Sequence, residues 1–134
     1  MNVLITGASS GMGKATALKL ANKKNDTSSS GAAVASITLM ARNEAKLEMV
    51  AAQIHEINPN CSTKVVVGDV TVSSDMQRAV DETVQAFGGL TACFLNAGVA
   101  RGGTELHQVN DGDMDLLINT NIKSVVYGLR AVLP

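Results

Sequence analysis

Residues 6–13 read TGASSGMG and lie between a short apolar run and a segment with helical periodicity. Residues 3–6 predict a buried strand, because apolar and β-branched side chains follow one another until Gly7. In such a stretch Gly7 permits a tight turn out of the strand, Gly11 lets the backbone approach a pyrophosphate, and Gly13 lets helix and strand pack closely. The N-terminus of the helix then presents unpaired N–H groups and a positive dipole end to phosphates. The stretch therefore predicts a dinucleotide-binding turn in a first β-α unit.

Two other interpretations of these glycines exist. A P-loop requires Gly, four residues, and then Gly-Lys followed by Ser or Thr. Here Gly13-Lys14 is followed by Ala15, and the residue five before Gly13 is Ala8, so the sequence excludes a P-loop. The other interpretation is a glycine-rich turn that binds no ligand, and the motifs further along the chain argue against it.

Short apolar runs alternate with longer helical segments along the rest of the chain. The predicted strands are residues 3–6, 34–40, 65–67 and 91–95, and the predicted helices are residues 11–24, 43–58, 74–87 and 113–133. This alternation indicates a parallel sheet with right-handed crossovers and helices on both faces. We expect an α/β fold, a Rossmann-type doubly wound parallel sheet, with residues 1–134 forming one domain. Functional residues should gather at the carboxyl ends of the strands.

Local signals predict how the helices begin, end and pack. Asn43 can cap the second helix, Asn58-Pro59 ends it, and Gly88-Gly89 ends the third. Residues 74–77 (SDMQ) fit a capping box, and residues 65–67 (VVV) predict a strand that is covered on both faces. The third helix is expected to bury Met76, Val80, Val84 and Phe87. Lys23 and Lys24 suit the last turn of the first helix, and residues 25–31 (NDTSSSG) predict a surface insertion after it.

Composition excludes several classes of protein. Hydrophobic residues make up 46% and charged residues 17% of the 134 positions, which is typical of a globular protein. A net charge of −1 gives no electrostatic footprint for nucleic acid, and no apolar run is long enough for a membrane span. The first residues lack the features of a signal peptide. Cys61, Cys93, His55 and His107 form no pattern of metal ligands. We expect a cytoplasmic protein without a metal.

Four motifs in order along the chain resemble the short-chain dehydrogenase/reductase family. They are TGASSGMG at residues 6–13, Asp69-Val70 after the third strand, Asn96-Ala97-Gly98 after the fourth, and Asn119-Thr120-Asn121 within the last helix. The resemblance implies that the strand order is 3-2-1-4. It also implies that Asp69 contacts the adenine ring, that residues 96–98 lie beside the cofactor ribose, and that Asn121 belongs to a catalytic tetrad. The cofactor contacts it implies are Gly7, Ser9, Ser10, Gly11, Met12, Gly13, Arg42, Asp69, Val70, Asn96, Ala97 and Gly98.

The residues after the second strand favour NADP(H) over NAD(H) as the cofactor. In NAD-specific members of the resembled family an acidic residue ends this strand, whereas here Ala41 stands at that place and Arg42 follows. A guanidinium can bind a 2′-phosphate through a bidentate pair. A hydrogen bond to a charged group contributes about 1.5–3 kcal/mol, which corresponds to a preference of roughly tenfold to hundredfold. The alternative is that Arg42 is a solvated residue at the start of a helix.

The resemblance implies hydride transfer between nicotinamide and an alcohol/carbonyl pair, with a small-molecule substrate. The family also uses a serine, and a tyrosine followed four residues later by a lysine. Tyr127 is the single tyrosine and Ala131 stands four positions later, so we expect the serine and the Tyr-x-x-x-Lys pair beyond Pro134. The first interpretation is accordingly a fragment of a reductase. A catalytically inactive dinucleotide-binding module and a non-functional truncated product are the alternatives.

Three further expectations follow from the same resemblance. The fourth strand would lie at an edge of the sheet, where unpaired backbone groups favour aggregation unless they are covered. Relatives commonly pair through the last helix, so residues 113–133 form a candidate interface of a homo-oligomer. Leu95 departs from the family pattern, which often has an asparagine there, and we expect a buried strand end to tolerate it.

Overall fold

The computed structural model describes residues 1–22, 34–101 and 105–133. The lysines at 23 and 24, the insertion predicted at residues 25–31 and part of the loop before the last helix lie outside these described residues. Within them, the order of elements follows the α/β alternation that the sequence predicts.

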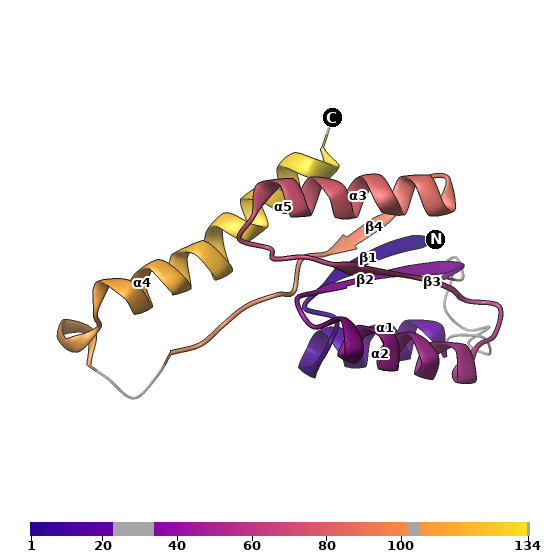
Figure 1. The fold of residues 1–134 in the computed structure, drawn as a ribbon, viewed down its shortest axis with the longest axis horizontal. Helices are drawn as coiled ribbons and strands as arrows, with labels where there is room; N and C mark the ends of the chain where they lie inside the picture. The colour runs from indigo at the N-terminus through magenta and orange to yellow at the C-terminus, as the bar shows by residue number, and fades with distance from the viewer. Residues whose placement is uncertain (23–33, 102–104, 134) are drawn as a thin grey trace, which may run out of the picture.

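The described strands form one parallel sheet in the order β3-β2-β1-β4 (Figure 1). Its strands are β1 (Asn2–Thr6), β2 (Ser36–Ala41), β3 (Ser62–Val67) and β4 (Ala92–Phe94). β1 pairs with both β2 and β4, with Ile5 opposite Leu39 on one side and Phe94 on the other. The predicted fold class and strand order are therefore confirmed. Because all strands run in the same direction, their carboxyl ends lie along one edge of the sheet.

Helices cover both faces of the sheet. Figure 1 shows α1 (Gly11–Ala21) and α2 (Glu44–Ile57) beneath it, with α3 (Ser73–Phe87) and α5 (Ser124–Val132) above it. Alternate side chains of β1 point to opposite faces, so that Val3 and Ile5 join the core under α1 and α2 while Leu4 joins the core under α3 and α5.

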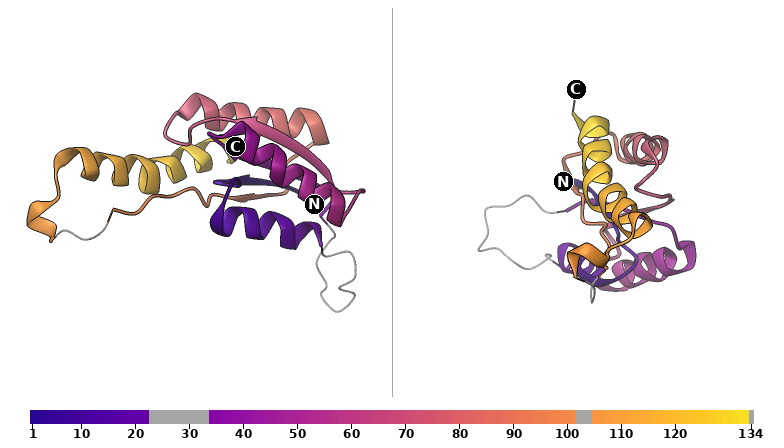
Figure 2. Two further views of the ribbon diagram at one scale, coloured as in Figure 1. Left: turned by 60° about the horizontal axis from the view of Figure 1, so that its bottom comes forward. Right: turned by 90° about the vertical axis from the view of Figure 1, so that its left-hand side faces the viewer.

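The last helical region is longer than one regular helix. It begins with α4 (Asp111–Ile118), which Asn110 caps by accepting a hydrogen bond from the Asp113 N–H (2.9 Å). A π-helical turn (Asn119–Lys123) then joins α4 to α5. A short 3₁₀ helix (Leu106–Gln108) precedes α4. Figures 1 and 2 show that α5 packs beside α3, whereas α4 extends well beyond the sheet.

Most of the predicted helix ends are confirmed. The side chain of Asn43 accepts a hydrogen bond from the Lys46 N–H (2.9 Å) and caps α2, which ends at Ile57. Gly88 ends α3 in the left-handed conformation, with a φ of 75°. The capping box at residues 74–77 is wrong, because α3 begins at Ser73 and its N-terminus has no side-chain cap. The side chain of Gln77 bonds instead to Asp81, one turn further along α3.

Two predictions about burial need correction. Val66 is the only one of the three valines at residues 65–67 that is buried, and Val67 is 39% exposed. The physical reason is that β3 lies at an edge of the described sheet and pairs with β2 alone. In α3, Met76 and Val80 are buried as predicted, but Val84 is 45% exposed and Phe87 is half-buried. Ala79 and Thr83 complete the buried face of α3 instead.

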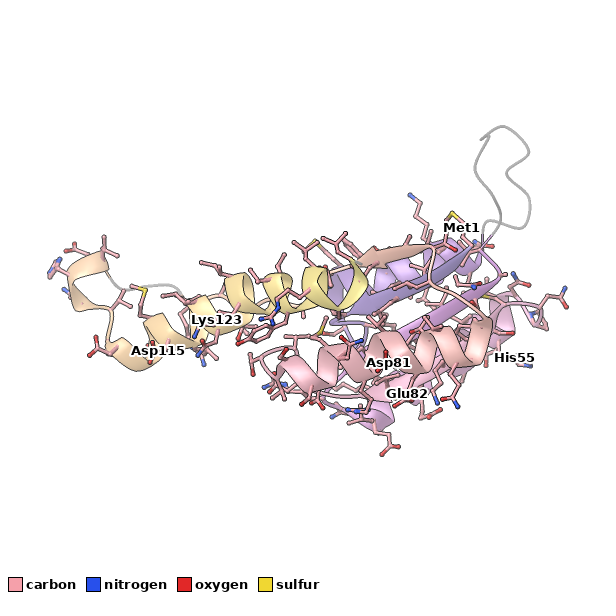
Figure 3. All side chains as sticks on the ribbon, turned by 90° about the horizontal axis from the view of Figure 1, so that it is seen from above. Met1, His55, Asp81, Glu82, Asp115 and Lys123 are labelled. Atoms are coloured by element: carbon pink, nitrogen blue, oxygen red, sulfur yellow. The ribbon has the colours of Figure 1, made fainter. Side chains whose placement is uncertain are left out.

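A chain of charged side chains ties the edge strand β3 to α3. Lys64 Nζ lies 3.0 Å from Glu82 Oε2, and Arg78 Nη1 lies 3.2 Å from Glu82 Oε1. Figure 3 shows Glu82 on the surface of α3. Hydrogen bonds, from Lys64 first and then from Arg78, lower the pKa of the Glu82 carboxyl below its ordinary value. This carboxylate therefore contributes to folding while it is ionised.

The lowered pKa of Glu82 predicts a pH dependence of stability. A carboxyl with a depressed pKa in the folded state stabilises the fold above its ordinary pKa of about 4.3, and this stabilisation is lost as the pH falls through the lowered value. Glu82→Gln should therefore reduce the loss of unfolding free energy between neutral pH and about pH 3, measured by urea unfolding. Glu56→Gln, on the exposed side of α2, is the control. An equal acid loss in both variants would contradict the prediction.

Candidate functional site

The glycine-rich loop (residues 7–13) leaves the carboxyl end of β1 and leads into α1. Gly7 has a φ of 67°, and a Cβ there would lie 2.9 Å from the Ala97 Cα. A Cβ at Gly13 would lie only 2.3 Å from the Gly7 carbonyl oxygen and 2.7 Å from Asn96 Nδ2. The loop thus folds closely onto itself and onto residues 96–97, and only glycine fits at Gly7 and Gly13.

The outer side of the same loop is open. Gly11 has a φ of 53°, and a Cβ added there would meet nothing within 4 Å. Ser10 occupies the N-cap position of α1 without a side-chain hydrogen bond to the helix. Ser9 is half-buried, Ser10 is exposed and Met12 is 76% exposed. The first-turn N–H groups of α1 therefore have no side-chain cap, and nothing covers the backbone at Gly11.

The end of β4 is tied to the end of β1 by Thr6. The Thr6 hydroxyl oxygen accepts hydrogen bonds from the Asn96 N–H (3.0 Å) and the Ala97 N–H (3.1 Å). The Asn96 side-chain amide donates in turn to the Thr6 carbonyl oxygen (3.2 Å). These bonds bring Asn96, Ala97 and Gly98 beside the glycine-rich loop. Sequence reasoning missed Thr6, although it opens the quoted motif, because its role depends on which strand lies next to β1.

Two more predicted site residues follow β2 and β3. Arg42 is exposed at the end of β2 and has no ion pair within the described ranges. Asp69 is half-buried in the turn after β3, and one of its carboxylate oxygens accepts hydrogen bonds from the Thr71 N–H (2.9 Å) and hydroxyl (2.8 Å). Val70 is buried. The Gly68 N–H donates to the Ala41 carbonyl oxygen (3.1 Å), which keeps the two strand ends together.

Asn121 connects the last helical region to the loop after β4. In the π-helical turn its Oδ1 accepts a hydrogen bond from the Val99 N–H (2.8 Å), and its Nδ2 donates to the Val99 carbonyl oxygen (2.8 Å). A Cβ on Gly98 would lie 3.1 Å from this Oδ1. The structure therefore brings Asn121 to residues 98–99, which directly follow the residues that contact the glycine-rich loop.

Tyr127 and Leu95 both pack against the hydrophobic core. Tyr127 is half-buried against the core under α3 and α5. Leu95 also packs against this core. Gly128 leaves the space that the leucine side chain fills, because a Cβ on Gly128 would lie 2.5 Å from Leu95 Cδ2. Sequence reasoning missed Gly128, since a glycine inside a helix carries no signal of the neighbour that requires it.

The cysteines and histidines form no second centre in the described part of the chain. Burial raises the pKa of Cys61 above its ordinary value and that of Cys93 to about 11, so both thiols are protonated at neutral pH. Within residues 1–22, 34–101 and 105–133, no three His, Cys, Asp or Glu side chains lie together in a way that could hold a metal ion. In the same ranges no helix is both long and apolar enough to cross a membrane.

The arrangement as a whole suits an elongated anionic ligand. The carboxyl ends of the strands present uncapped helix N–H groups, an exposed guanidinium and a carboxylate at one edge of a parallel sheet. Such an edge can bind a pyrophosphate at the helix N-terminus and a base or ribose at the flanking strand ends. The predicted cofactor contacts lie in the segments that directly follow the strands and in the first turn of α1.

Comparison with known proteins agrees with this geometry. The family model described as short chain dehydrogenase matches residues 1–134. An uncharacterized oxidoreductase of Listeria monocytogenes is 36% identical over 133 residues, which cover 98% of this chain and 48% of that relative. The chain thus spans about half the length of the curated relatives it matches.

Solved structures share the fold. The crystal structure of levodione reductase superposes with a TM-score of 0.86 at 30% identity, covering 98% of this chain and 47% of that one. An NADH-dependent reductase complexed with NAD gives a TM-score of 0.81 at 25% identity, covering 99% of this chain and 50% of that one. The sheet and its glycine-rich loop are therefore those of a known enzyme fold.

The close packing at Gly13 predicts the effect of a single methyl group. Gly13→Ala should lower the free energy of unfolding by about 1–3 kcal/mol or more, because its Cβ would overlap a backbone oxygen that cannot rotate away. Gly89→Ala is the control, since a Cβ there meets nothing within 4 Å. Chemical denaturation measures both, and an unchanged midpoint for Gly13→Ala would mean that the loop does not hold this conformation.

Proposed function

The chain belongs to the short-chain dehydrogenase family, and on this premise we propose that it binds NADP(H) for hydride transfer between nicotinamide and an alcohol/carbonyl pair. The observation that carries the proposal is the glycine-rich loop. It is closed against Asn96 and Ala97 on its inner side and open at Gly11 on its outer side. Residues 1–134 are then the dinucleotide-binding part of the enzyme.

The residues at the sheet edge fit a dinucleotide. The first-turn N–H groups of α1 would bind the pyrophosphate, with Ser9, Ser10 and Met12 around it. Asp69 and Val70 would hold the adenine ring, and residues 96–98 would lie beside a ribose. The bound cofactor supplies the hydride, while the protein supplies position and protons. Asn121 would act at the reacting end, where it already anchors Val99.

The preference for NADP(H) rests on Arg42. It is exposed at the end of β2, and Ala41 beside it offers no carboxylate that would repel a 2′-phosphate. NAD(H) is the competing cofactor, since one of the solved structures with this fold is an NADH-dependent reductase complexed with NAD.

A catalytically inactive binding module is the second candidate. Tyr127 packs in the core and is followed four residues later by Ala131, so neither candidate assigns it an acid/base role. Hydride transfer is therefore proposed for a protein of the length of the relatives. Dinucleotide binding is common to both candidates. The mass of the protein in its native source, together with reductase activity there, distinguishes them.

We predict that the chain binds NADPH and that Arg42→Ala weakens this binding by roughly tenfold or more. The same change should leave NADH binding within about twofold, because NADH lacks the 2′-phosphate. Titration followed by nicotinamide fluorescence measures both dissociation constants. Arg130→Ala, an exposed arginine on α5, is the control. Equal losses for the two cofactors would refute the role of Arg42, and no binding of either cofactor would refute the proposed function.

An exposed apolar stripe supports assembly with a second copy. It runs along α4, the π-helical turn and α5 at spacings of three and four residues. Its members are Met114, Ile118, Ile122, Val126, Leu129 and Leu133, each at least 36% exposed. A stripe of this kind marks a contact surface, and we assign it to the interface of a homo-oligomer.

The stripe predicts the effect of a charge on the oligomeric state. Ile122→Lys should shift the protein toward the monomer, because a buried lysine without a partner opposes association. Met49→Lys on α2 is a matched control, since Met49 is 61% and Ile122 59% exposed. Sedimentation velocity measures the oligomeric state of both. An unchanged oligomer in the Ile122 variant would place the interface elsewhere.

A further inference from the structure

Two side chains of α3 hold the backbone of the turn after β3. The Asp75 carboxylate accepts a hydrogen bond from the Asp69 N–H through Oδ2 (2.9 Å). Arg78 Nη2 donates to the Val67 carbonyl oxygen (2.8 Å). Asp75 Oδ1 and Arg78 Nη2 bind each other at 3.0 Å. The pair therefore binds the backbone on both sides of Gly68, in addition to the pairing of β3 with β2.

The turn lies directly on this pair and on the end of β2. A Cβ at Gly68 would lie 2.9 Å from Met40 Cε, 3.2 Å from the Asp75 Cβ and 3.3 Å from Arg78 Nη2. The Gly68 N–H also donates a hydrogen bond to the Ala41 carbonyl oxygen at the end of β2. The position of Asp69 is consequently set by contacts from β2 on one side and from α3 on the other.

One carboxylate oxygen of Asp69 remains available to accept a hydrogen bond from a ligand. Both hydrogen bonds from Thr71 go to Oδ1. Oδ2 has no hydrogen bond within the described ranges, and the side chain is half-buried at the carboxyl edge of the sheet. A carboxylate fixed in this way presents a single, oriented acceptor.

Electrostatics keep the pair in place. The N–H of Asp69 and the guanidinium of Arg78 face the Asp75 carboxylate. The other nitrogen of that guanidinium, Nη1, binds Glu82, which is also paired with Lys64. The Asp69 N–H first, and Arg78 next, lower the pKa of the Asp75 carboxyl below its ordinary value. Arg78 also offsets the repulsion that two neighbouring carboxylates would otherwise suffer.

We propose that Asp75 and Arg78 are positioning residues for base recognition, holding the turn so that Asp69 Oδ2 accepts a hydrogen bond from the exocyclic amino group of adenine. The 6-amino group of adenine is a hydrogen-bond donor, and a carboxylate accepts from it but offers nothing to a keto oxygen. The inference rests on the proposed function, which assigns Asp69 to the adenine ring. It adds that two residues outside the binding surface determine which base is selected.

The experiment compares NADPH with its hypoxanthine analogue, in which a keto oxygen replaces the amino group. The two ligands carry the same phosphates, so charge changes in the protein affect both equally. The unaltered chain should prefer NADPH by about tenfold or more. Asp75→Ala should reduce this preference to less than about threefold, mainly by weakening NADPH. Asp81→Ala removes an equal charge from the same helix and should leave the preference unchanged, because among the described residues the Asp81 side chain has a hydrogen bond from Gln77 alone.

Arg78→Lys is the second variant, because it keeps the charge but loses the guanidinium, whose Nη2 binds the Val67 carbonyl oxygen and Asp75 Oδ1 while its Nη1 binds Glu82. Circular dichroism tests whether each variant is folded. If Asp75→Ala does not fold, Arg78→Lys tests the inference in its place, and the preference for NADPH should again fall to less than about threefold. Equal weakening of both ligands would mean that the pair only stabilises the fold, and would overturn the inference. Binding by the unaltered chain without preference for NADPH would overturn it as well, while leaving dinucleotide binding intact. No binding of either ligand by the unaltered chain would overturn the proposed function and this inference together.

Discussion

The arrangement of the site depends on the contact between the carboxyl ends of β1 and β4. Thr6 accepts two backbone N–H groups with one hydroxyl oxygen, and this places Asn96 and Ala97 within contact of Gly7 and Gly13. A side chain at either glycine would push the loop away from β4. The start of α1, and with it the direction of its N-terminal N–H groups, would then change. The close contact between these two loops therefore sets the direction in which the first turn of α1 presents its N–H groups.

The central position of β1 explains why this contact is rigid. Its even-numbered Leu4 and odd-numbered Val3 and Ile5 enter opposite cores, so the strand is clamped from both faces as well as by β2 and β4 on its sides. β3 lacks this support because it pairs with β2 alone. Charged side chains give β3 the support that a second neighbouring strand would give. They link β3 and the turn after it to α3, through Lys64, Glu82, Arg78 and Asp75. If the site binds a dinucleotide as proposed, the central strand would support its phosphate end and the charged network would support its base end.

The sequence predicted best what depends on neighbours along the chain. The strand–glycine–helix order, the Asn43 cap and the Gly88 stop each involve groups a few residues apart, and they are confirmed. The sequence-based predictions were wrong where a residue far along the chain determines the local structure. Residues 65–67 were expected to be covered on both faces, because valines alone do not reveal that β3 is an edge. Residues 74–77 fit a capping box in sequence, but α3 starts at Ser73 and the side chain of Gln77 bonds to Asp81. Thr6, Asp75 and Gly128 could not be found for the same reason, since each acts on a segment that only the fold brings near.

The π-helical turn links two features that are far apart in function. Asn121 holds Val99 through both atoms of its amide, and Val99 adjoins the residues that face the glycine-rich loop. Ile122, the next residue, is 59% exposed in the apolar stripe. Successive residues of a helix point in directions about 100° apart, so Asn121 reaches Val99 while Ile122 lies in the apolar stripe. If a second copy covers that stripe, the pressure it exerts on Ile122 acts on the same turn that positions Asn121. Under the proposed function, assembly would then act on the turn that holds Asn121 beside Val99, without any contact between the partner and Val99.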